Sequence, residues 1–305
     1  MIPASAPGGL GAFEGERVRL TGLAYRITGS LADAEDVVQE VWIRWASQDA
    51  ATVDSPAGWL TTVTSRLALD RLRAQRRRRE VYVGPWLPDP VPTARDVEET
   101  AELAESLTLG FLILLDSLGP YERVALLLGD VFGEPYPAIA EILGKSESAC
   151  RQLVSRARRK LHSARPSAGT PAPSPASAEL LEQLMDSVLA GDEERTLSLL
   201  HPDVVLISDA GPARRAARHP VVGAERVRQL LKDSWRLIAF KTHASPDERP
   251  PARRIEVNSS PSLVLDTPEG PIVITGEAIR GQITSIWVRL NPDRTAALED
   301  PRPIV

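Results

Sequence analysis

A segment rich in proline, serine and alanine divides this chain into two halves and constrains its fold more than any other feature. Residues 163–177 contain four Pro, four Ser and four Ala, with no larger apolar side chain besides the proline rings. Such a composition cannot bury a core and is typical of an extended linker. Apolar residues before the segment repeat at helical spacing, whereas short β-branched runs between Pro and Gly dominate after it. We therefore predict an all-helical half followed by a mixed half.

A second break divides the helical half. Gly84 and Pro85, followed by three more prolines before residue 95, exclude a helix there. A chain of 305 residues is long enough for three domains, each with its own core. We expect domains over residues 10–82, 105–162 and 178–296, linkers over residues 83–104 and 163–177, and a tail over residues 297–305.

Composition argues against several classes of protein. The apolar run from Phe111 to Leu115 is far shorter than the roughly 20 residues that a membrane-spanning helix needs. The first eleven residues lack the basic start and apolar stretch of an export signal. We therefore expect a cytoplasmic protein with no membrane contact. A single cysteine, Cys150, and four histidines without ligand spacing predict no disulfide, no metal and no cofactor.

Charge is distributed unevenly along the helical half. The net charge is −5, yet six arginines lie within nine residues from Arg71 to Arg79, and a second basic cluster spans residues 151–165. So many cations on one helix repel each other unless an anion lies alongside, and nucleic-acid phosphates are the obvious candidate.

Two helices are predicted in the first domain. Apolar residues from Ala34 to Trp45 recur at helical spacing, and Asp36, Glu40 and Arg44 follow each other on another face. From spacing alone, a solvated charged surface is the favoured interpretation of that face. The next helix starts with Ser55 as N-cap and Pro56 at its first position.

These residues resemble region 2 of a bacterial sigma factor of the extracytoplasmic function (ECF) type. The resemblance rests on residues 34–40, Trp42, Trp45 and residues 59–73. It implies that the first helix binds core RNA polymerase and that the second helps to recognise and open the minus-10 promoter element. The implied polymerase-binding residues are Asp36, Gln39, Glu40 and Arg44. The implied DNA-binding residues are Arg66, Arg73, Arg76, Arg77 and Arg78, with Arg66 replacing an asparagine that is common in the wider family.

The second domain has the pattern of a helix-turn-helix. A helix over residues 137–143 is followed by a turn at Gly144 and Lys145, and Ser146 is the N-cap of the next helix. The polar face of that last helix carries Ser148, Arg151, Gln152, Ser155, Arg156 and Arg159. Arginine and glutamine can read base edges in the major groove, although a solvated basic helix would show the same pattern. After the first domain, this unit resembles sigma region 4, which reads the minus-35 element.

The third domain is predicted to have an α+β fold. Helices over residues 178–200 precede a strand, a helix and further short strands, which we expect to form a curved antiparallel sheet. Together with short motifs near residues 201, 220 and 281, this order resembles a SnoaL-like domain, a cone-shaped fold around a pocket. A small ligand in that pocket is a candidate partner. His201, Asp203 and Asp209 are candidate acids or bases, but ordinary turn chemistry is the favoured interpretation.

The order of the three domains resembles the SigJ-like sigma factors, in which the C-terminal domain regulates activity. Two signatures of that subgroup carry the resemblance. In the linker they are Trp86, Leu87, Pro88, Asp89 and Pro90, and near the end they are Asn291, Pro292 and Asp293, where Arg294 replaces the usual lysine. The loop from Asp209 to Ala213 lacks the subgroup's glycine-rich, lysine-containing pattern.

The leading prediction is therefore a multidomain sigma factor, with two all-α DNA-binding domains and an α+β regulatory domain. Its expected partners are core RNA polymerase and promoter DNA, and it is not expected to be an enzyme. Two alternatives stay open at this point. One is a ligand-sensing helix-turn-helix regulator, and the other is a SnoaL-like isomerase or cyclase with an appended DNA-binding region.

Overall fold

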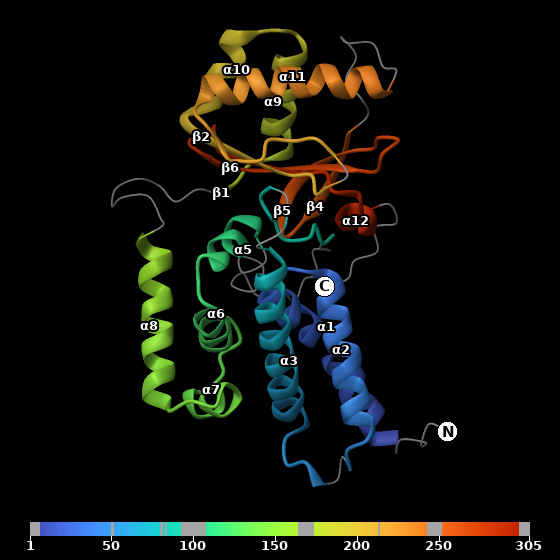
Figure 1. The fold of residues 1–305 in the computed structure, drawn as a ribbon, viewed down its shortest axis with the longest axis vertical. Coiled ribbons are helices and arrows are strands. Elements are labelled where there is room, and N and C mark those ends of the chain that lie inside the picture. Colours follow the sequence, from blue (N-terminus) through green and yellow to red (C-terminus); the bar gives the residue numbers. More distant parts are fainter. Residues whose placement is uncertain are drawn as a thin grey trace.

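The computed structural model describes residues 7–49, 52–79, 82, 84–92, 108–163, 174–212, 214–242 and 252–298, and at residues 7–9, 78, 79, 236–242 and 297 the description covers the backbone alone. The expected linker residues 93–104 and the tail beyond residue 298 lie outside these ranges. Figure 1 shows a helical half at the bottom and a sheet covered by helices at the top.

Three long helices form the first helical group. They are α1 (Pro7–Thr28), α2 (Leu31–Ala46) and α3 (Pro56–Arg79). Ser30 caps α2 by accepting a hydrogen bond from the Asp33 amide. The predicted start of α3 is confirmed, because Ser55 Oγ accepts from the Gly58 amide and Pro56 is the first helical residue.

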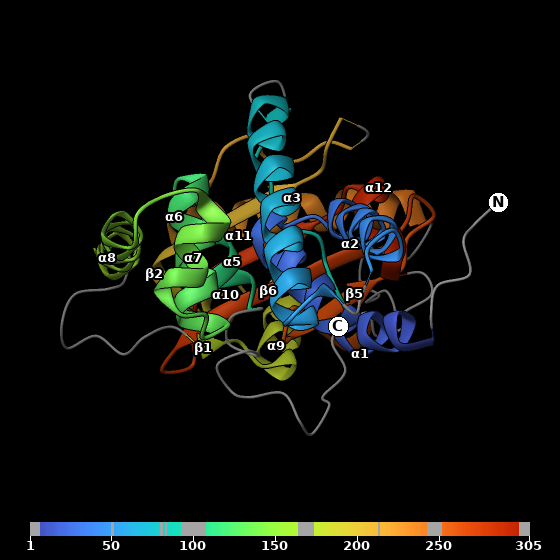
Figure 2. The same ribbon diagram turned by 90° about the horizontal axis from the view of Figure 1, so that it is seen from below.

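The second helical group contains the predicted helix-turn-helix. Its elements are α5 (Leu109–Asp116), α6 (Pro120–Leu126), the π-helix η2 (Leu127–Val131), α7 (Tyr136–Leu143) and α8 (Glu147–Ser163). Gly144 ends α7 with φ of 61°, a conformation that favours glycine, and turns the chain into α8. Both helical groups share one continuous apolar core that reaches from Phe13 to Ala157. In Figure 2, α6 and α7 lie between α3 and the outlying α8.

The C-terminal domain is a layer of helices on a mixed sheet. The helices are α9 (Ala178–Leu189), α10 (Glu193–Leu199), α11 (Ala224–Thr242) and the short α12 (Pro292–Thr295), which continues into η3 (Ala296–Leu298). The strands are β1 (Ser174–Pro175), β2 (Leu200–Asp209), β3 (Val221–Val222), β4 (Ala252–Val257), β5 (Ser260–Leu265), β6 (Ile272–Ile279) and β7 (Gln282–Arg289). The sheet order is β3-β2-β7-β6-β5-β4, with β1 paired to β6. Helices α9, α10 and α11 cover one face, and the other face turns toward the helical half (Figure 1).

Two expectations for this half were wrong. The sheet is not wholly antiparallel, because β2 and β7 run parallel. A long connection through β3, α11, β4, β5 and β6 joins β2 to β7, and such a connection leaves their relative direction free. Residues 174–177 are also not linker, since Ser174 and Pro175 pair with β6 and Ser177 caps α9. Within the described ranges, we find no helix long and apolar enough to cross a membrane.

Candidate nucleic-acid interface

Arg66 of α3 contacts the second helical group. Its Nη2 donates to the carbonyl of Glu141 at 2.7 Å, and its Nε donates to the carbonyl of Ile142 at 3.3 Å. Both carbonyls lie in the last turn of α7, where the helix dipole leaves partial negative charge. The arginine predicted to face the promoter therefore binds the end of a helix in the helix-turn-helix.

Two further arginines of α3 contact the same helical group. Arg76 donates to the carbonyls of Asp116 and Leu118, at the end of α5. The guanidinium of Arg73 lies 5.4 Å from the centre of the Tyr121 ring in α6, a cation–π contact. Arg77 is exposed, and the side chain of Arg78 lies outside the described residues.

A buried arginine that sequence analysis missed strengthens this junction. Arg123 of α6 is fully buried and donates twice to the carbonyl of Arg26, at the end of α1. Its Nη1 also donates to Asp116 at 2.6 Å. The only available signal was a cation directly before the apolar run that begins at Val124, and no pattern pointed to a partner 97 residues away. Arg123 therefore joins the two helical groups.

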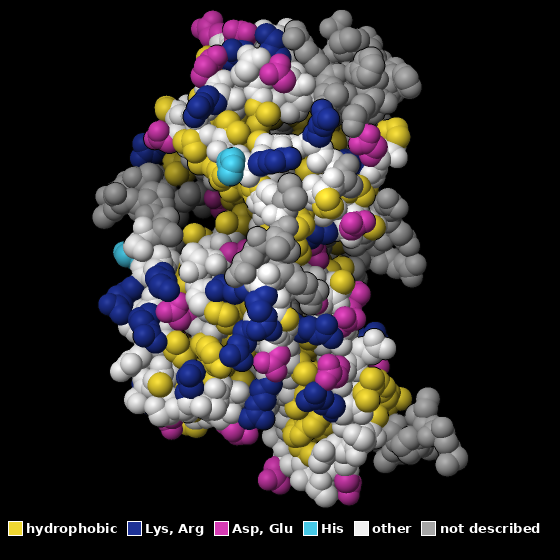
Figure 3. All heavy atoms as spheres, in the orientation of Figure 1, with side chains coloured by type: hydrophobic (Ala, Val, Ile, Leu, Met, Phe, Trp, Pro, Cys, Tyr) yellow, Lys and Arg dark blue, Asp and Glu magenta, His cyan; other side chains and the backbone are white. Residues whose placement is uncertain are grey.

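The predicted polar face of α8 is exposed in full. It carries Ser148, Arg151, Gln152, Ser155, Arg156 and Arg159. Arg151 pairs with Glu147 at 2.8 Å, and Arg156 lies 3.9 Å from Glu122. These partners are acidic side chains of the same helical group, unlike those of the α3 arginines. In Figure 3, Lys and Arg gather over the helical half, from α8 across toward α3.

The residues predicted to bind polymerase lie on the surface of α2. Asp36, Gln39 and Arg44 are exposed and Glu40 is half-buried. Glu40 and Arg44 form an ion pair at 2.6 Å, and Asp36 lies 3.7 Å from Arg71 of α3. The structure thus brings these four residues to one helix surface.

Asp89, in the inter-region linker, connects all three parts of the chain. Its Oδ2 accepts from the Leu31 amide at the start of α2, at 2.7 Å. Its Oδ1 accepts from Nε of Arg294, which follows the C-terminal sheet, at 2.6 Å. Its carbonyl accepts from the Tyr25 hydroxyl of α1, and that hydroxyl accepts from Asn258. Burial and the Asp89 charge raise the pKa of Tyr25, which keeps the phenol neutral.

Asp209, the last residue of β2, is the second acceptor of Arg294. Its Oδ2 accepts from Arg294 Nη1 at 2.6 Å and from the Leu87 amide at 2.9 Å, and its Oδ1 accepts from the Tyr82 hydroxyl at 2.6 Å. Its side chain is only 1% exposed. Burial would lower the pKa of Arg294, but the charges of Asp89 and Asp209 outweigh it and raise that pKa. We call Tyr82, Leu87, Asp89, Asp209 and Arg294 the interdomain network.

Asp209 corrects an expectation. The chain does turn at Gly211 and Pro212, yet the Asp209 carboxylate accepts hydrogen bonds from the linker and from Arg294 rather than from amides of that turn. Its partners come from residues 122 and 127 positions away, which local sequence cannot show. His201 and Asp203 were expected in a turn before a strand, but they lie inside β2, where the register shifts between Leu200 and Val205 and the Asp203 amide donates to His201 Nδ1.

The two predicted regulatory motifs meet at this network. Trp86 lies under the Arg294 guanidinium, 4.0 Å from the ring centre, and Leu87 and Pro88 are buried. Asn291 is buried and donates to the Tyr82 hydroxyl at 3.1 Å. Pro292 begins α12, and Asp293 is exposed. The sequence patterns therefore located both segments, Asp89 and Arg294 included, but did not show that Tyr82 and Asp209 join them.

Apolar contacts extend the same junction to α5. Leu87, Leu109 and Trp287 form a buried cluster that joins the linker, α5 and β7. A Cβ placed on Gly110 of α5 would lie 1.9 Å from Glu277 Oε1 on β6, so glycine permits this close approach. Burial raises the pKa of the Glu277 carboxyl.

Comparisons with known proteins agree with this geometry. Residues 13–78 match the family model of sigma-70 region 2, and residues 111–161 match that of sigma-70 region 4. The ECF RNA polymerase sigma factor SigJ of Mycobacterium tuberculosis is 44% identical over 222 residues, which cover 72% of this chain and 70% of SigJ. The chain belongs to the ECF RNA polymerase sigma factors.

Two further comparisons extend the match beyond the helical half of this sigma factor. The probable ECF sigma factor SigI of M. tuberculosis is 34% identical over 285 residues, covering 92% of each chain. The crystal structure of M. tuberculosis SigJ superposes with a TM-score of 0.74 at 33% identity, covering 94% of this chain and 98% of that one. The C-terminal helix-and-sheet domain is thus part of a shared architecture with a SnoaL-like fold.

Membership of this family confirms the leading functional prediction. ECF sigma factors bind core RNA polymerase and promoter DNA and direct the start of transcription. Both predicted DNA-binding regions fall within the matched ranges. These matches favour a sigma factor over the ligand-sensing regulator and over the isomerase or cyclase.

Proposed function

We propose that this sigma factor rests in a closed arrangement in which the C-terminal domain restrains its two DNA-binding regions. The observation that carries the proposal is Arg294, a nearly buried cation held between Asp89 of the linker and Asp209 of β2. The inter-region linker sets how far regions 2 and 4 can separate. A domain that binds the linker therefore biases their spacing.

The interdomain network is strong enough for this role. Arg294 is 12% exposed and makes charge-assisted hydrogen bonds to two carboxylates. Removing one partner of a buried pair typically costs about 3–5 kcal/mol, because the remaining charge is left without compensation. Separation of the domains in water re-solvates all three charged groups, so the closed arrangement is reversible.

Closure also occupies groups that we expect to bind DNA. Arg66 and Arg76 donate to helix carbonyls of region 4, and Arg73 contacts Tyr121. Phosphates of promoter DNA would compete for the same donors, since arginine binds phosphate through the same N–H groups. Promoter binding and docking of region 4 on α3 are therefore expected to exclude each other.

The remaining roles follow from the exposed surfaces. We assign core-polymerase binding to Asp36, Gln39, Glu40 and Arg44 of α2. We assign duplex reading to the exposed polar face of α8, and contacts to the opened strand to the arginines of α3 once region 4 moves away. In this proposal the protein acts by binding and catalyses no reaction, and a small ligand is a candidate regulator.

Transcription in vitro tests the closed arrangement in the full chain. Arg294→Met should weaken the contact with the linker and raise initiation from a cognate promoter when the sigma factor is limiting. Each 1.4 kcal/mol by which the substitution favours the open form over the closed form raises the ratio of open to closed protein about tenfold. Arg254→Met is the matched control, because Arg254 pairs with Glu179 and Glu182 inside the C-terminal domain. If both variants initiate like the parent chain, Arg294 does not restrain the protein.

A further inference from the structure

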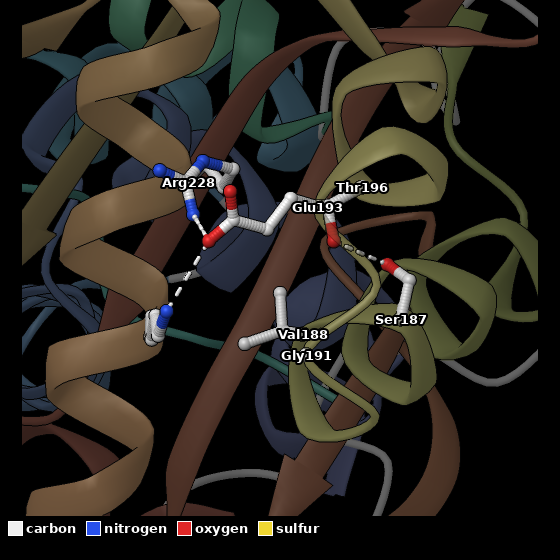
Figure 4. Close-up of a pocket in the computed structure, with 7 residues that line it drawn as sticks. Ser187, Val188, Gly191, Glu193, Thr196 and Arg228 are labelled. Carbon is white, nitrogen blue, oxygen red and sulfur yellow. Dashed lines mark hydrogen bonds and ion pairs between the residues drawn. The ribbon is translucent and has the colours of Figure 1, made fainter.

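Two spaces of very different size lie among the described residues of the C-terminal domain. One lies between α9, α10 and α11, where Glu193 accepts from Arg228 at 2.7 Å and Thr196 bonds to Ser187 (Figure 4). Its volume is about 10 Å³, which is room for one water molecule. The other has a volume of about 620 Å³ and lies at the end of β2, on the side of the linker. Its size falls in the range of small-molecule sites.

The lining of the larger cavity is basic and otherwise small. It consists of Gly84 from the linker together with Ser208, Ala210, Gly211, Pro212, Arg214, Arg215, Ala216, Ala217 and Arg218. Three of these residues are arginines, and none of the described lining residues is acidic. The small Ala, Gly and Pro residues form apolar surface between the arginines. An organic anion can contact both this apolar surface and the cations, so it suits the site better than a bare inorganic ion.

Arg214 is a fixed cation in this wall. Its side chain is 5% exposed, and its Nη2 donates to the Gly270 carbonyl at 2.9 Å and to Thr267 Oγ1 at 3.3 Å. Its Nε forms an ion pair with a Glu269 carboxylate oxygen at 3.6 Å, which is too long for a hydrogen bond, and has no hydrogen-bond acceptor within the described part of the chain. A buried N–H without an acceptor is costly, and an anion in the cavity would supply one.

We infer that this cavity binds a small organic anion bearing a phosphate or carboxylate group. Arg214 supplies a preorganised guanidinium, and Arg215 and Arg218, both exposed, supply two adaptable ones. Guanidinium groups bind phosphate and carboxylate oxygens in pairs, which favours these ligand classes over neutral molecules. The water-sized space between the helices, by contrast, has no room for such a molecule.

The position of the cavity links the ligand to the proposed regulation. Gly84 approaches Arg218 so closely that a Cβ on Gly84 would lie 3.9 Å from the Arg218 Cα. Ala210 and Gly211 directly follow Asp209 of the interdomain network. A bound anion would thus contact both sides of the junction between linker and domain. This regulatory consequence rests on the proposed function, whereas the site itself does not.

Calorimetric titration of the full chain tests the site without polymerase or DNA. The probes are inorganic pyrophosphate, citrate and adenosine monophosphate, at up to about 10 mM, where binding is still measurable. We expect one-to-one binding of at least one probe. Arg215→Gln with Arg218→Gln should weaken it by about tenfold, since both arginines are exposed and each exposed charge pair contributes at most about 1 kcal/mol. Ala216→Trp should abolish it by filling the cavity.

Two exposed arginines elsewhere in the domain provide the control. Arg226→Gln with Arg280→Gln removes the same charge from α11 and from the turn after β6. Equal weakening by both double variants would reduce the effect to general charge and overturn the site. Absence of binding by all three probes, or unchanged binding in Ala216→Trp, would overturn it as well. Displacement of the probe by promoter duplex alone would assign the arginines to DNA instead.

Transcription then separates the site from its regulatory consequence. A probe that binds should change initiation by the parent chain and leave the Arg215→Gln, Arg218→Gln variant unaffected. Binding with no change in initiation would retain the anion site and reject its coupling to the linker. Failure of the Arg294→Met experiment, in turn, would reject the closed arrangement and leave the calorimetric result intact.

Discussion

The two arginine-rich helices, α3 and α8, differ in where their cations find partners. Arg66 and Arg76 of α3 donate to carbonyls of the other helical group, whereas Arg151 and Arg158 of α8 pair with acidic side chains of their own group. The availability of α3 for DNA therefore depends on how the two regions are arranged. The availability of α8 does not. One fold thus contains a conditional and an unconditional DNA-binding surface.

Breaking the junction between the helical groups should have the largest effect. Arg123→Met leaves the Arg26 carbonyl and Asp116 without their buried cation, and we expect a loss of about 3–5 kcal/mol in the free energy of unfolding. Urea denaturation measures this loss. Arg158→Met on α8 is the control, because its exposed pair with Asp130 should contribute less than about 1 kcal/mol.

The outcome bears directly on the contrast between the helices. If Arg123→Met loses no more stability than Arg158→Met, region 4 does not depend on this cation for its docking on region 2. The idea that docking of region 4 controls the access of DNA to α3 would then lose its main structural evidence.

Substitutions of Arg66 on α3 and Arg159 on α8 compare the two helices directly, and we expect smaller effects than for Arg123→Met. Arg159→Gln should change the relative use of promoters, since one good base contact discriminates by about 1–3 kcal/mol, and should leave hydrogen exchange of α7 unchanged. Arg66→Gln should accelerate exchange of the α7 amides in the free protein, because the end of α7 loses its cation. Equal effects of both substitutions on both measurements would mean that the two helices do not differ in this way.

The smallest expected effect concerns Tyr82, in the linker between the two regions. Burial and its hydrogen bond to Asp209 raise the pKa of Tyr82 to about 12, from 10 in the unfolded chain. The stabilisation from the neutral phenol is therefore complete below pH 10 and is lost as the pH rises toward 12. Tyr82→Phe should flatten the fall in stability over this interval, which thermal unfolding at several pH values measures. An unchanged slope would exclude Tyr82 as its source.

Local features of the fold were predictable from the sequence, because their causes lie within a few residues. Ser55 and Pro56 start α3 as expected, and Gly144 with Ser146 forms the turn of the helix-turn-helix. The two short motifs, one in the linker and one near the C-terminus, also identified the two segments that contact each other in the interdomain network. Each of these signals depends on backbone geometry or on a short pattern.

Long-range partners were not predictable in the same way. The role of Asp209 depends on Tyr82 and Leu87, and the role of Arg66 depends on helix α7, about 75 residues further along the chain. The resemblance to sigma region 2 assigned Arg66 to DNA without showing its partners inside the protein. The parallel pairing of β2 with β7 was not predicted for a related reason. Apolar periodicity shows which face of a strand is buried, but not the direction in which the strand runs.

The place of Arg294 in the chain has a consequence for biosynthesis. All described strands and both arginine-rich helices precede it, so a ribosome completes them before the cation that joins Asp89 to Asp209 emerges. Under the proposed closed arrangement, a nascent chain would therefore expose α3 and α8 before Arg294 can restrain them. A protease that cuts just before Asn291 would likewise remove the proposed restraint and leave α3 and α8 whole.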